Sequence, residues 1–294
     1  MTARLTRRAL VAGAFATLAL AACSPAGLLN GASSLAGADR AHRAAAGKPF
    51  GPDPRLKLDV WVPDRRPAGP LPVVVFFYGG GWVAGNRGDY GFAGRALAAR
   101  GFIAVVPDYR LVPEVRFPTF LQDGAAAVRW VHDNIARFGG DPNRIALSGH
   151  SAGAYNAAML ALDPHFLADA GLPPRTIKAA ALLSGPYDFY PFTEQRGRDA
   201  LGAWPRPLET QPVHFVRRDA PPLLLLHGSA DEVVEPRNSI ALADALRRAG
   251  ATVELRIYPG QSHIDLAKAL SPLFRRSNPA LADSARFLAL HDRP

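Results

Sequence analysis

Gly149-His150-Ser151-Ala152-Gly153 is the stretch of this sequence that decides its fold. It follows an apolar run over residues 144–148, typical of a buried strand, and leads into a helical pattern over residues 152–162. This is the G-x-S-x-G pattern in the strand–turn–helix setting where the serine occupies a strained turn and its oxygen projects above the sheet. A side chain at either glycine would crowd that turn, and the following helix N-terminus adds partial positive charge beneath it. The motif predicts that Ser151 is a nucleophile.

A second glycine-rich motif, Tyr78-Gly79-Gly80-Gly81-Trp82, follows the apolar run 73–77. Consecutive glycines adopt backbone conformations denied to other residues and let peptide amides approach a ligand closely. Amides aimed at a developing oxyanion stabilise the transition state of acyl transfer, and losing one such donor costs on the order of 10²–10³ in rate. We therefore expect an oxyanion hole formed by the amides of Gly80, Gly81 and Ala152.

A serine nucleophile needs a base, and the base needs an orienting acid. Folds with a nucleophile elbow carry them in the chain order serine, acid, histidine. Asp231 follows the apolar run 223–228, and His263 follows the predicted strand 252–258, so both lie at carboxyl ends of strands. We predict Asp231 as the acid and His263 as the base. The alternatives for the acid are Glu232 and Glu235, and the histidines that fit worse as the base are His132, His150, His165 and His227.

Apolar, β-rich runs alternate with helical patterns from residue 55 onward. Several runs are continuous, as expected of parallel strands covered by helices on both faces. The alternation predicts an α/β fold with a mostly parallel, doubly wound sheet, in which sites lie at the carboxyl ends of the strands. The predicted strands are 56–62, 73–77, 103–107, 144–148, 179–184, 223–228 and 252–258, and the predicted helices are 91–100, 119–138, 152–162, 237–249 and 280–290.

The segment 188–222 interrupts this rhythm with many prolines and aromatic residues. It is too long for a simple turn, and we interpret it as a small cap that walls the site, the alternative being a loop that covers core. Large aromatic side chains near the motifs are candidates for the pocket wall, although each is equally compatible with plain core. These candidates are Trp82, Tyr155, Tyr187 and Phe189.

The N-terminus has the pattern of an export signal. Arginines precede an apolar run over residues 9–22, which is shorter than the ~20 residues of a membrane-spanning helix. Residues 1–22 are therefore predicted to be a secretory signal peptide. The adjacent Arg7 and Arg8 also match a twin-arginine signal.

Cys23 is the only cysteine of the chain and ends the sequence Leu20-Ala21-Ala22-Cys23. This resembles the bacterial lipobox, in which the signal is cut before the cysteine and the thiol receives a diacylglycerol. We expect an exported, membrane-anchored lipoprotein, the alternative being a plain signal cleaved after Ala21 or Ala22. Residues 23–50 are rich in Ala, Gly and Ser and are predicted to be the lipidated cysteine and a flexible tether, which leaves 51–294 as the catalytic domain.

The net charge of +9 comes almost entirely from scattered arginines. No run of basic residues and no nucleic-acid motif accompanies it, so the charge indicates a solvated surface rather than a nucleic-acid partner. A single cysteine excludes an internal disulfide. No cluster with metal-ligand spacing is present in the sequence, and neither a metal nor a cofactor is expected.

Taken together, these motifs resemble the α/β-hydrolase esterases of the hormone-sensitive-lipase-like group and the related carbohydrate and feruloyl-type esterases. That group carries His-Gly-Gly-Gly-Trp/Phe, Gly-x-Ser-Ala-Gly, an Asp, a His, and a segment like Asp108-Tyr109-Arg110-Leu111-Val112-Pro113-Glu114. The similarity runs from about residue 57 to the C-terminus. The chain departs from it at Tyr78, where the group has a histidine that supports the oxyanion loop, and in the apparent lack of a helical N-terminal cap, which predicts an open site.

The resemblance implies a carboxylic ester hydrolase that acts through an acyl-enzyme on a small ester outside the cytoplasm. The bulk of Trp82 and the aromatic insert favour a short acyl group, or an aromatic or sugar alcohol. Kynurenine formamidases and isoprenylcysteine methylesterases are similar in the same stretches, so hydrolysis of an activated amide is one alternative. Another is a non-catalytic, surface-anchored binding protein on a hydrolase fold. The sequence leaves the oligomeric state open.

Overall fold

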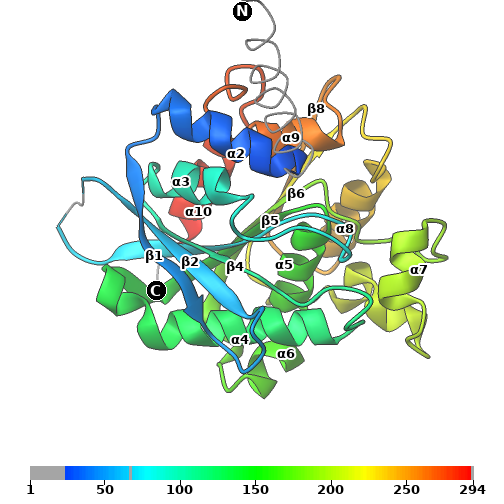
Figure 1. The fold of residues 1–294 in the computed structure, drawn as a ribbon. Helices are drawn as coiled ribbons and strands as arrows, with labels where there is room; N and C mark the ends of the chain where they lie inside the picture. Colours follow the sequence, from blue (N-terminus) through cyan, green and yellow to red (C-terminus); the bar gives the residue numbers. More distant parts are fainter. Residues whose placement is uncertain (1–23, 66–67, 293–294) are drawn as a thin grey trace, which may run out of the picture.

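The computed structural model describes residues 24–65 and 68–292 (Figure 1). These residues build an α/β-hydrolase fold around an eight-stranded sheet in the order β1-β2-β4-β3-β5-β6-β7-β8. The strands are β1 (Ala41–Pro49), β2 (Lys57–Pro63), β3 (Leu71–Phe77), β4 (Ile103–Pro107), β5 (Gly140–His150), β6 (Ile177–Leu183), β7 (Leu223–Gly228) and β8 (Val253–Tyr258). Strands β3 to β8 run parallel, whereas β1 and β2 are antiparallel to their neighbours.

Helices cover both faces of this sheet (Figure 1). On one face, α3 (Gly91–Ala98) packs against α10 (Ala280–His291). On the other, α4 (Thr119–Asn134) packs against α5 (Ala152–Leu162), and α8 (Arg237–Arg248) lies over β7 and β8. Short helices complete the fold: α6 (Pro164–Asp169), α7 (Gln195–Leu201) and α9 (His263–Lys268), with the 3-10 turns η1 (Ile135–Phe138), η2 (Pro174–Thr176), η3 (Pro207–Thr210) and η4 (Pro212–Phe215). The predicted strands and helices all appear, within a few residues of their predicted ends.

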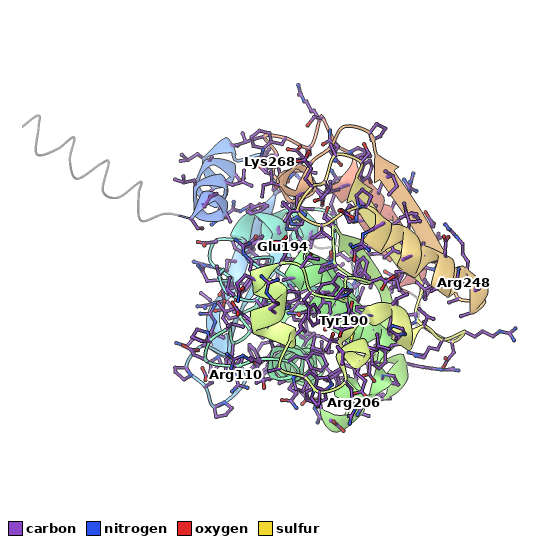
Figure 2. All side chains as sticks on the ribbon, turned by 90° about the vertical axis from the view of Figure 1, so that its right-hand side faces the viewer. Arg110, Tyr190, Glu194, Arg206, Arg248 and Lys268 are labelled. Atoms are coloured by element: carbon purple, nitrogen blue, oxygen red, sulfur yellow. The ribbon has the colours of Figure 1, made fainter. Side chains whose placement is uncertain are left out.

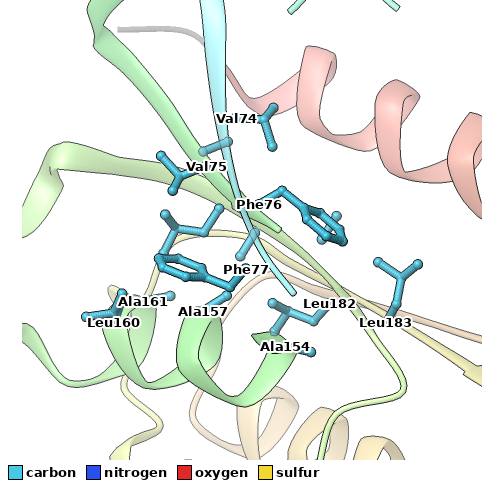
Figure 3. Packing of buried hydrophobic residues seen from close by; sticks show 14 of the residues in the cluster. Val74, Val75, Phe76, Phe77, Ala154, Ala157, Leu160, Ala161, Leu182 and Leu183 are labelled. Atoms are coloured by element: carbon cyan, nitrogen blue, oxygen red, sulfur yellow. The ribbon is translucent and has the colours of Figure 1, made fainter. Parts of the chain in front are cut away.

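The core explains why the central strands read as continuous apolar runs. In β3, the side chains from Val73 to Phe77 are fully buried, because helices close over both faces. Figure 3 shows this packing, with alanines of α5 turned toward β3 and β6. Small side chains on α5 let the helix axis approach the sheet closely. This close packing fixes the position of the N-terminus of α5.

The N-terminal stretch corrects one prediction. Instead of a flexible tether, residues after Ser24 form α2 (Pro25–Ala36) and the edge strand β1. The Ser24 side chain caps α2 by accepting a hydrogen bond from the Gly27 amide, and Pro25 occupies the first turn, where its missing N–H is no loss.

Strand β1 pairs with β2 along its length, and two of its residues contact Asp59 of β2. The Gly47 amide donates to Asp59 Oδ1 over 2.8 Å, and Arg43 Nη1 lies 3.1 Å from Asp59 Oδ2. The composition of this segment predicts disorder because most of its side chains are small and few are large and apolar. An edge strand, however, is stabilised by backbone hydrogen bonds to its neighbour, and side-chain composition does not report these bonds.

Cys23 and the predicted signal peptide lie outside the described residues. Within the residues that the structure does describe, no helix is long and apolar enough to cross a bilayer.

Candidate active site

Ser151 lies in the tight turn between β5 and α5. Its backbone has φ 56° and ψ −125°, a left-handed conformation that non-glycine residues adopt only when the surrounding structure enforces it. A Cβ at Gly149 would lie 2.4 Å from Gly153 O, and one at Gly153 would lie 2.1 Å from Phe77 O. The two glycines are therefore required because backbone passes against backbone on both sides of the serine.

The structure brings the three residues predicted from separate strands into one hydrogen-bonded chain. Ser151 Oγ lies 2.9 Å from His263 Nε2, and His263 Nδ1 lies 2.8 Å from Asp231 Oδ2. A carboxylate only accepts hydrogen bonds, so His263 Nδ1 carries the proton and Nε2 presents its lone pair to the serine hydroxyl. The arrangement can deprotonate Ser151 without any change of side-chain position. Glu232 and Glu235, the alternative acids, have no such contact with His263 among the described residues.

Asp231 is held ionised by donors on three sides. Its Oδ1 accepts hydrogen bonds from the amides of Val233 and Val234 at 3.0 and 2.9 Å, and its Oδ2 lies 3.3 Å from His227 Nε2. Burial alone would raise the pKa of Asp231, but the hydrogen bonds from His227 and His263 outweigh it and lower that pKa. Asp231 therefore stays a carboxylate at neutral pH.

Two further histidines support this chain. His227 is fully buried, with Nε2 2.7 Å from the Val234 carbonyl and Nδ1 2.7 Å from Ser239 Oγ. Because a carbonyl only accepts, Nε2 carries the proton, and Nδ1 accepts from the serine hydroxyl when the ring is neutral. His227 thus ties the acid loop to α8.

His150 lies beneath His263, with ring centroids 4.7 Å apart. Its Nε2 donates to the His263 carbonyl over 2.9 Å, and its Nδ1 is buried without a hydrogen-bond partner among the described residues. Burial, with a smaller effect from His263, lowers the pKa of His150 to about 3. His150 is therefore a neutral ring that fixes the backbone of His263.

The predicted oxyanion loop has the backbone that its glycines allow. Gly80 and Gly81 have φ values of 135° and 61°, and a Cβ at Gly80 would lie 2.1 Å from the Ala84 carbonyl oxygen. Within the described chain, the N–H groups of Gly80 and Gly81 have no hydrogen-bond acceptor, and Ala152, as the first residue of α5, has no intrahelical one. A Cβ at Gly79 would lie 3.1 Å from Ser151 Cβ, so the loop passes directly beside the serine.

Tyr78 anchors this loop in a way that the sequence did not reveal. Its hydroxyl accepts from Arg55 Nη2 over 3.3 Å and donates to Asp108 Oδ1 over 3.1 Å. Asp108 also accepts from the Arg87 amide over 2.7 Å and pairs with the Arg87 guanidinium, at the far end of the same loop. Burial and the Asp108 carboxylate raise the pKa of Tyr78, which keeps its hydroxyl protonated. A tyrosine therefore links both ends of the loop where the resembling group has a histidine.

Three of the four pocket-wall candidates, Trp82, Tyr155 and Tyr187, are buried, and only Phe189 is half-buried. Tyr155 and Tyr187 are fully buried and belong to the core, where Tyr155 Oη donates to the Thr210 carbonyl. Phe189 is half-buried and stacks on Trp82 with ring centroids 6.3 Å apart, while Trp82 Nε1 donates to Asn156. Phe189 and Trp82 are the pair that connects the insertion to the oxyanion loop.

The insertion between β6 and β7 contains α7, η3 and η4, and it reaches the loop through Arg196. The Arg196 side chain lies across Gly81, since a Cβ there would meet Arg196 Cδ at 2.6 Å. Figure 2 looks onto the face that carries this insertion, with Tyr190 and Glu194 labelled. The segment 188–222 thus folds as short helices rather than as a simple loop, with α7 reaching Gly81 and η4 packing against α5 and α8.

Comparison with known families decides the relationship of this chain. The BD-FAE family profile matches residues 58–246. The chain belongs to the BD-FAE family. This match spans strands β2 to β7, most of α8 and the motifs around Tyr78, Ser151 and Asp231.

Curated relatives of this BD-FAE chain are esterases by name. Esterase LipC of Mycobacterium tuberculosis is 33% identical over 235 residues, which cover 73% of this chain and 58% of the relative. Isoprenylcysteine alpha-carbonyl methylesterase ICME of Arabidopsis thaliana is 34% identical over 240 residues, covering 74% and 56%. The chain thus spans a little over half the length of these relatives.

Solved structures share the fold of this BD-FAE chain. A truncated carbohydrate esterase from gut microbiota has a TM-score of 0.75 at 20% identity, covering 87% of this chain and 98% of that one. A thermophilic esterase of Thermogutta terrifontis, described with propionate bound, has a TM-score of 0.69 at 28% identity, covering 84% and 94%.

Sequence reasoning missed the supporting residues of the site. From the sequence, His150 and His227 are only less suitable candidates for the base, and nothing connects Arg55 and Arg87 with Tyr78. Their roles depend on contacts between distant segments, for which the sequence carries no local signal. Among the described residues, no group of three or more His, Cys, Asp or Glu side chains gathers as a metal site would require.

Replacing Tyr78 tests the anchor of the oxyanion loop. We expect Tyr78→Phe to lower the free energy of unfolding by about 1–3 kcal/mol, because a buried hydrogen bond to a charged group is lost. It should also lower kcat for a short p-nitrophenyl ester by roughly tenfold, since the amides of the loop are less firmly placed. Urea unfolding and steady-state kinetics measure the two effects.

The matched control for this change is Tyr258→Phe, which removes a 2.8 Å hydrogen bond to Asp283 far from the loop. It should lower stability to a similar extent and leave kcat within about twofold. Equal losses of kcat in both variants would show that Tyr78 acts only through overall stability.

His150 should make stability depend on pH in the acidic range. An unfolded histidine has a pKa of about 6.5, and the folded value is about 3. Between these values the unfolded chain binds more protons, so stability falls as pH decreases below about 6.5. We expect His150→Gln, which does not titrate, to lose stability less steeply over this range, by up to a few kcal/mol.

Urea unfolding at a series of pH values measures this slope, and His214→Gln at an exposed position is the control. Parallel curves for wild type and His150→Gln would contradict the assignment of a buried, neutral His150.

Proposed function

We propose that this protein hydrolyses carboxylic esters through an acyl-enzyme on Ser151. The observation that carries the proposal is the chain from Ser151 Oγ through His263 to Asp231, with contacts of 2.9 and 2.8 Å. Membership of the BD-FAE family and the esterase names of the relatives support it.

In this mechanism His263 Nε2 takes the proton of the Ser151 hydroxyl as Oγ attacks the ester carbonyl carbon. The carbonyl oxygen becomes an oxyanion and accepts hydrogen bonds from the amides of Gly80, Gly81 and Ala152. Asp231 stabilises the imidazolium that forms on His263. His263 then gives its proton to the departing alcohol, which leaves Ser151 acylated.

Water completes the cycle. His263 removes a proton from a water molecule, and the resulting hydroxide attacks the acyl carbonyl in the same oxyanion hole. Collapse of the second intermediate releases the carboxylic acid and returns the proton to Ser151. The donors of the oxyanion hole serve both steps, because the negative charge develops on the same oxygen.

We propose a short acyl group, or a small aromatic or sugar alcohol, as the substrate class. Trp82 and Phe189 stack beside the oxyanion loop, and Arg196 lies across Gly81, so bulky side chains crowd this side of the serine. The propionate that is described in the Thermogutta terrifontis esterase is a three-carbon acid, which fits a small acyl site.

Substitution of the triad tests the proposal. We expect Ser151→Ala and His263→Ala to lower kcat for p-nitrophenyl butyrate by about 10⁴–10⁶-fold, and Asp231→Asn by about 10⁴-fold, because each removes an essential part of one catalytic unit. Ser151→Ala should also abolish labelling by a fluorophosphonate probe. Initial rates and in-gel fluorescence measure these changes.

Ser229→Ala is the control, since Ser229 is an exposed serine near Asp231 that only accepts a hydrogen bond from the Gly260 amide. It should keep both activity and labelling. Absence of turnover and of labelling in the wild-type protein would leave a non-catalytic binding protein as the better interpretation.

We also propose that the protein is exported and anchored to a membrane by a lipid on Cys23, with the twin-arginine pathway as the export route. The sequence Leu20-Ala21-Ala22-Cys23 supports this, and it stands immediately before the residue that caps α2. Globomycin should cause an unprocessed precursor to accumulate, and Cys23→Ser should move the protein from the membrane to the soluble fraction. Normal processing and membrane retention in both experiments would indicate an ordinary signal peptide.

A further inference from the structure

Helix α2 is an unusual surface helix. Its twelve residues, PAGLLNGASSLA, include no charged side chain, and only Ser33 is buried. Leu28 and Leu35 are 44% and 91% exposed. A helix on the surface of a water-soluble domain ordinarily turns a charged or polar face outward, so the outer face of α2 is not adapted to water alone.

Exposed apolar side chains from two other segments lie beside α2. Ile264, from α9, is 46% exposed, and Leu273 and Phe274, just after α9, are 49% and 40% exposed. With Leu28 they line an apolar groove of about 320 Å³ between α2 and α9. We call Leu28, Ile264, Leu273 and Phe274 the α2–α9 apolar face.

This face concentrates the exposed apolar surface of the domain. The structure describes ten exposed large apolar side chains, and four of them belong to this face. Single exposed leucines are ordinary, whereas a contiguous group marks a site of contact with a protein, a ligand or a membrane. This contiguous group of exposed apolar side chains therefore indicates a contact surface.

The face is held rigidly against the catalytic domain. Ser33 Oγ and Ser271 Oγ lie 2.8 Å apart, Arg275 binds Asp39 through two contacts of 2.6 and 2.8 Å, and Asn30 donates to the Gly88 carbonyl over 2.9 Å. These bonds fix α2 with Leu29 packed against the core and with Leu28 and Leu35 exposed to solvent.

The chain itself indicates what covers the face. Ser24 caps α2, and the residue before it is Cys23. Leu28 lies one turn into the helix, so a lipid on Cys23 would hold the groove within about one helical turn of the bilayer surface. Lys268 also lines the groove, with its amine 5.7 Å from the Phe274 ring centroid. A lysine with an apolar stem and a charged end suits the boundary between acyl chains and headgroups. Figure 2 shows Lys268 beside α2.

We propose that the α2–α9 apolar face lies against the lipid bilayer, with the side chains of Leu28, Ile264, Leu273 and Phe274 inserted among the lipid acyl chains. The inference rests on the proposed anchor at Cys23. It also places the site at the membrane, because α9 begins at His263 and Asn30 binds the loop that starts at the Gly79–Gly81 turn.

Tryptophan quenching tests the orientation in the full-length chain. Leu273→Trp places a fluorophore on the face, and Leu290→Trp places one near the end of α10, at a site that is 60% exposed against 49% for Leu273. That site lies at the opposite end of the sheet, since the nearby Asp292 pairs with Arg144 in the first half of β5. Vesicles of phosphatidylethanolamine and phosphatidylglycerol with brominated acyl chains quench only a tryptophan that enters the bilayer, and emission of the parent chain is subtracted.

We expect at least twofold stronger quenching of the added emission in Leu273→Trp than in Leu290→Trp. Equal quenching at both sites, or none at residue 273, overturns the proposal. A change in the Leu273→Trp emission that depends on protein concentration and is insensitive to vesicles also overturns it, because a second copy then covers the face.

Two measurements separate this inference from the proposals it builds on. Hydrolysis of p-nitrophenyl butyrate by the same variants reports the esterase activity independently of membrane contact. The same quenching experiment in a Cys23→Ser background measures whether the face contacts the membrane when residue 23 cannot be lipidated. Selective quenching of Leu273→Trp in this background supports membrane contact of the face even if Cys23 carries no lipid. Absence of selective quenching in both backgrounds rejects membrane contact of the face even if Cys23 is lipidated.

Discussion

The close approach of α5 to the ends of β3 and β5 is the constraint on which the rest of this structure depends. Backbone meets backbone there, since a Cβ at Gly153 would fall 2.1 Å from the Phe77 carbonyl oxygen. The approach forces Ser151 into a left-handed conformation and directs its hydroxyl toward His263. It also brings Gly79 beside Ser151, so the nucleophile and the oxyanion loop are placed by the same contact.

Buried polar residues then hold the surrounding loops at the positions that this contact sets. His227 and two backbone amides stabilise the charge of Asp231, and His150 holds the backbone of His263. On the other side, Tyr78 and Asp108 tie the two ends of the oxyanion loop together. A buried carboxylate is costly unless donors surround it, so each of these loops has one strongly favoured position.

The N-terminal segment is ordered, although its composition predicts a flexible tether. Residues 25–49 have the small, simple side chains of a linker, and the sequence alone predicts a tether there. In the fold, β1 completes the sheet through backbone hydrogen bonds to β2, and α2 is fixed by contacts with Ser271 and Gly88. Ser271 and Gly88 lie far from α2 in the sequence, and β2, although it follows β1 directly, pairs with it through backbone groups. Composition reports neither kind of contact, which is why it could not reveal the structure.

The sequence by itself determined the α/β class and the run of parallel strands, and it predicted Ser151, Asp231 and His263 as the catalytic residues, because each depends on local pattern and on chain order. Only the tertiary structure decided which residues support them. Tyr78 finds Arg55 and Asp108, and Tyr155 and Tyr187 turn into the core instead of a pocket. The apolar side chains of α2 and α9 likewise meet only in the folded chain. The physical reason is that hydrogen-bond partners and burial are set by contacts between distant segments, whereas motifs and periodicity are properties of neighbours along the chain.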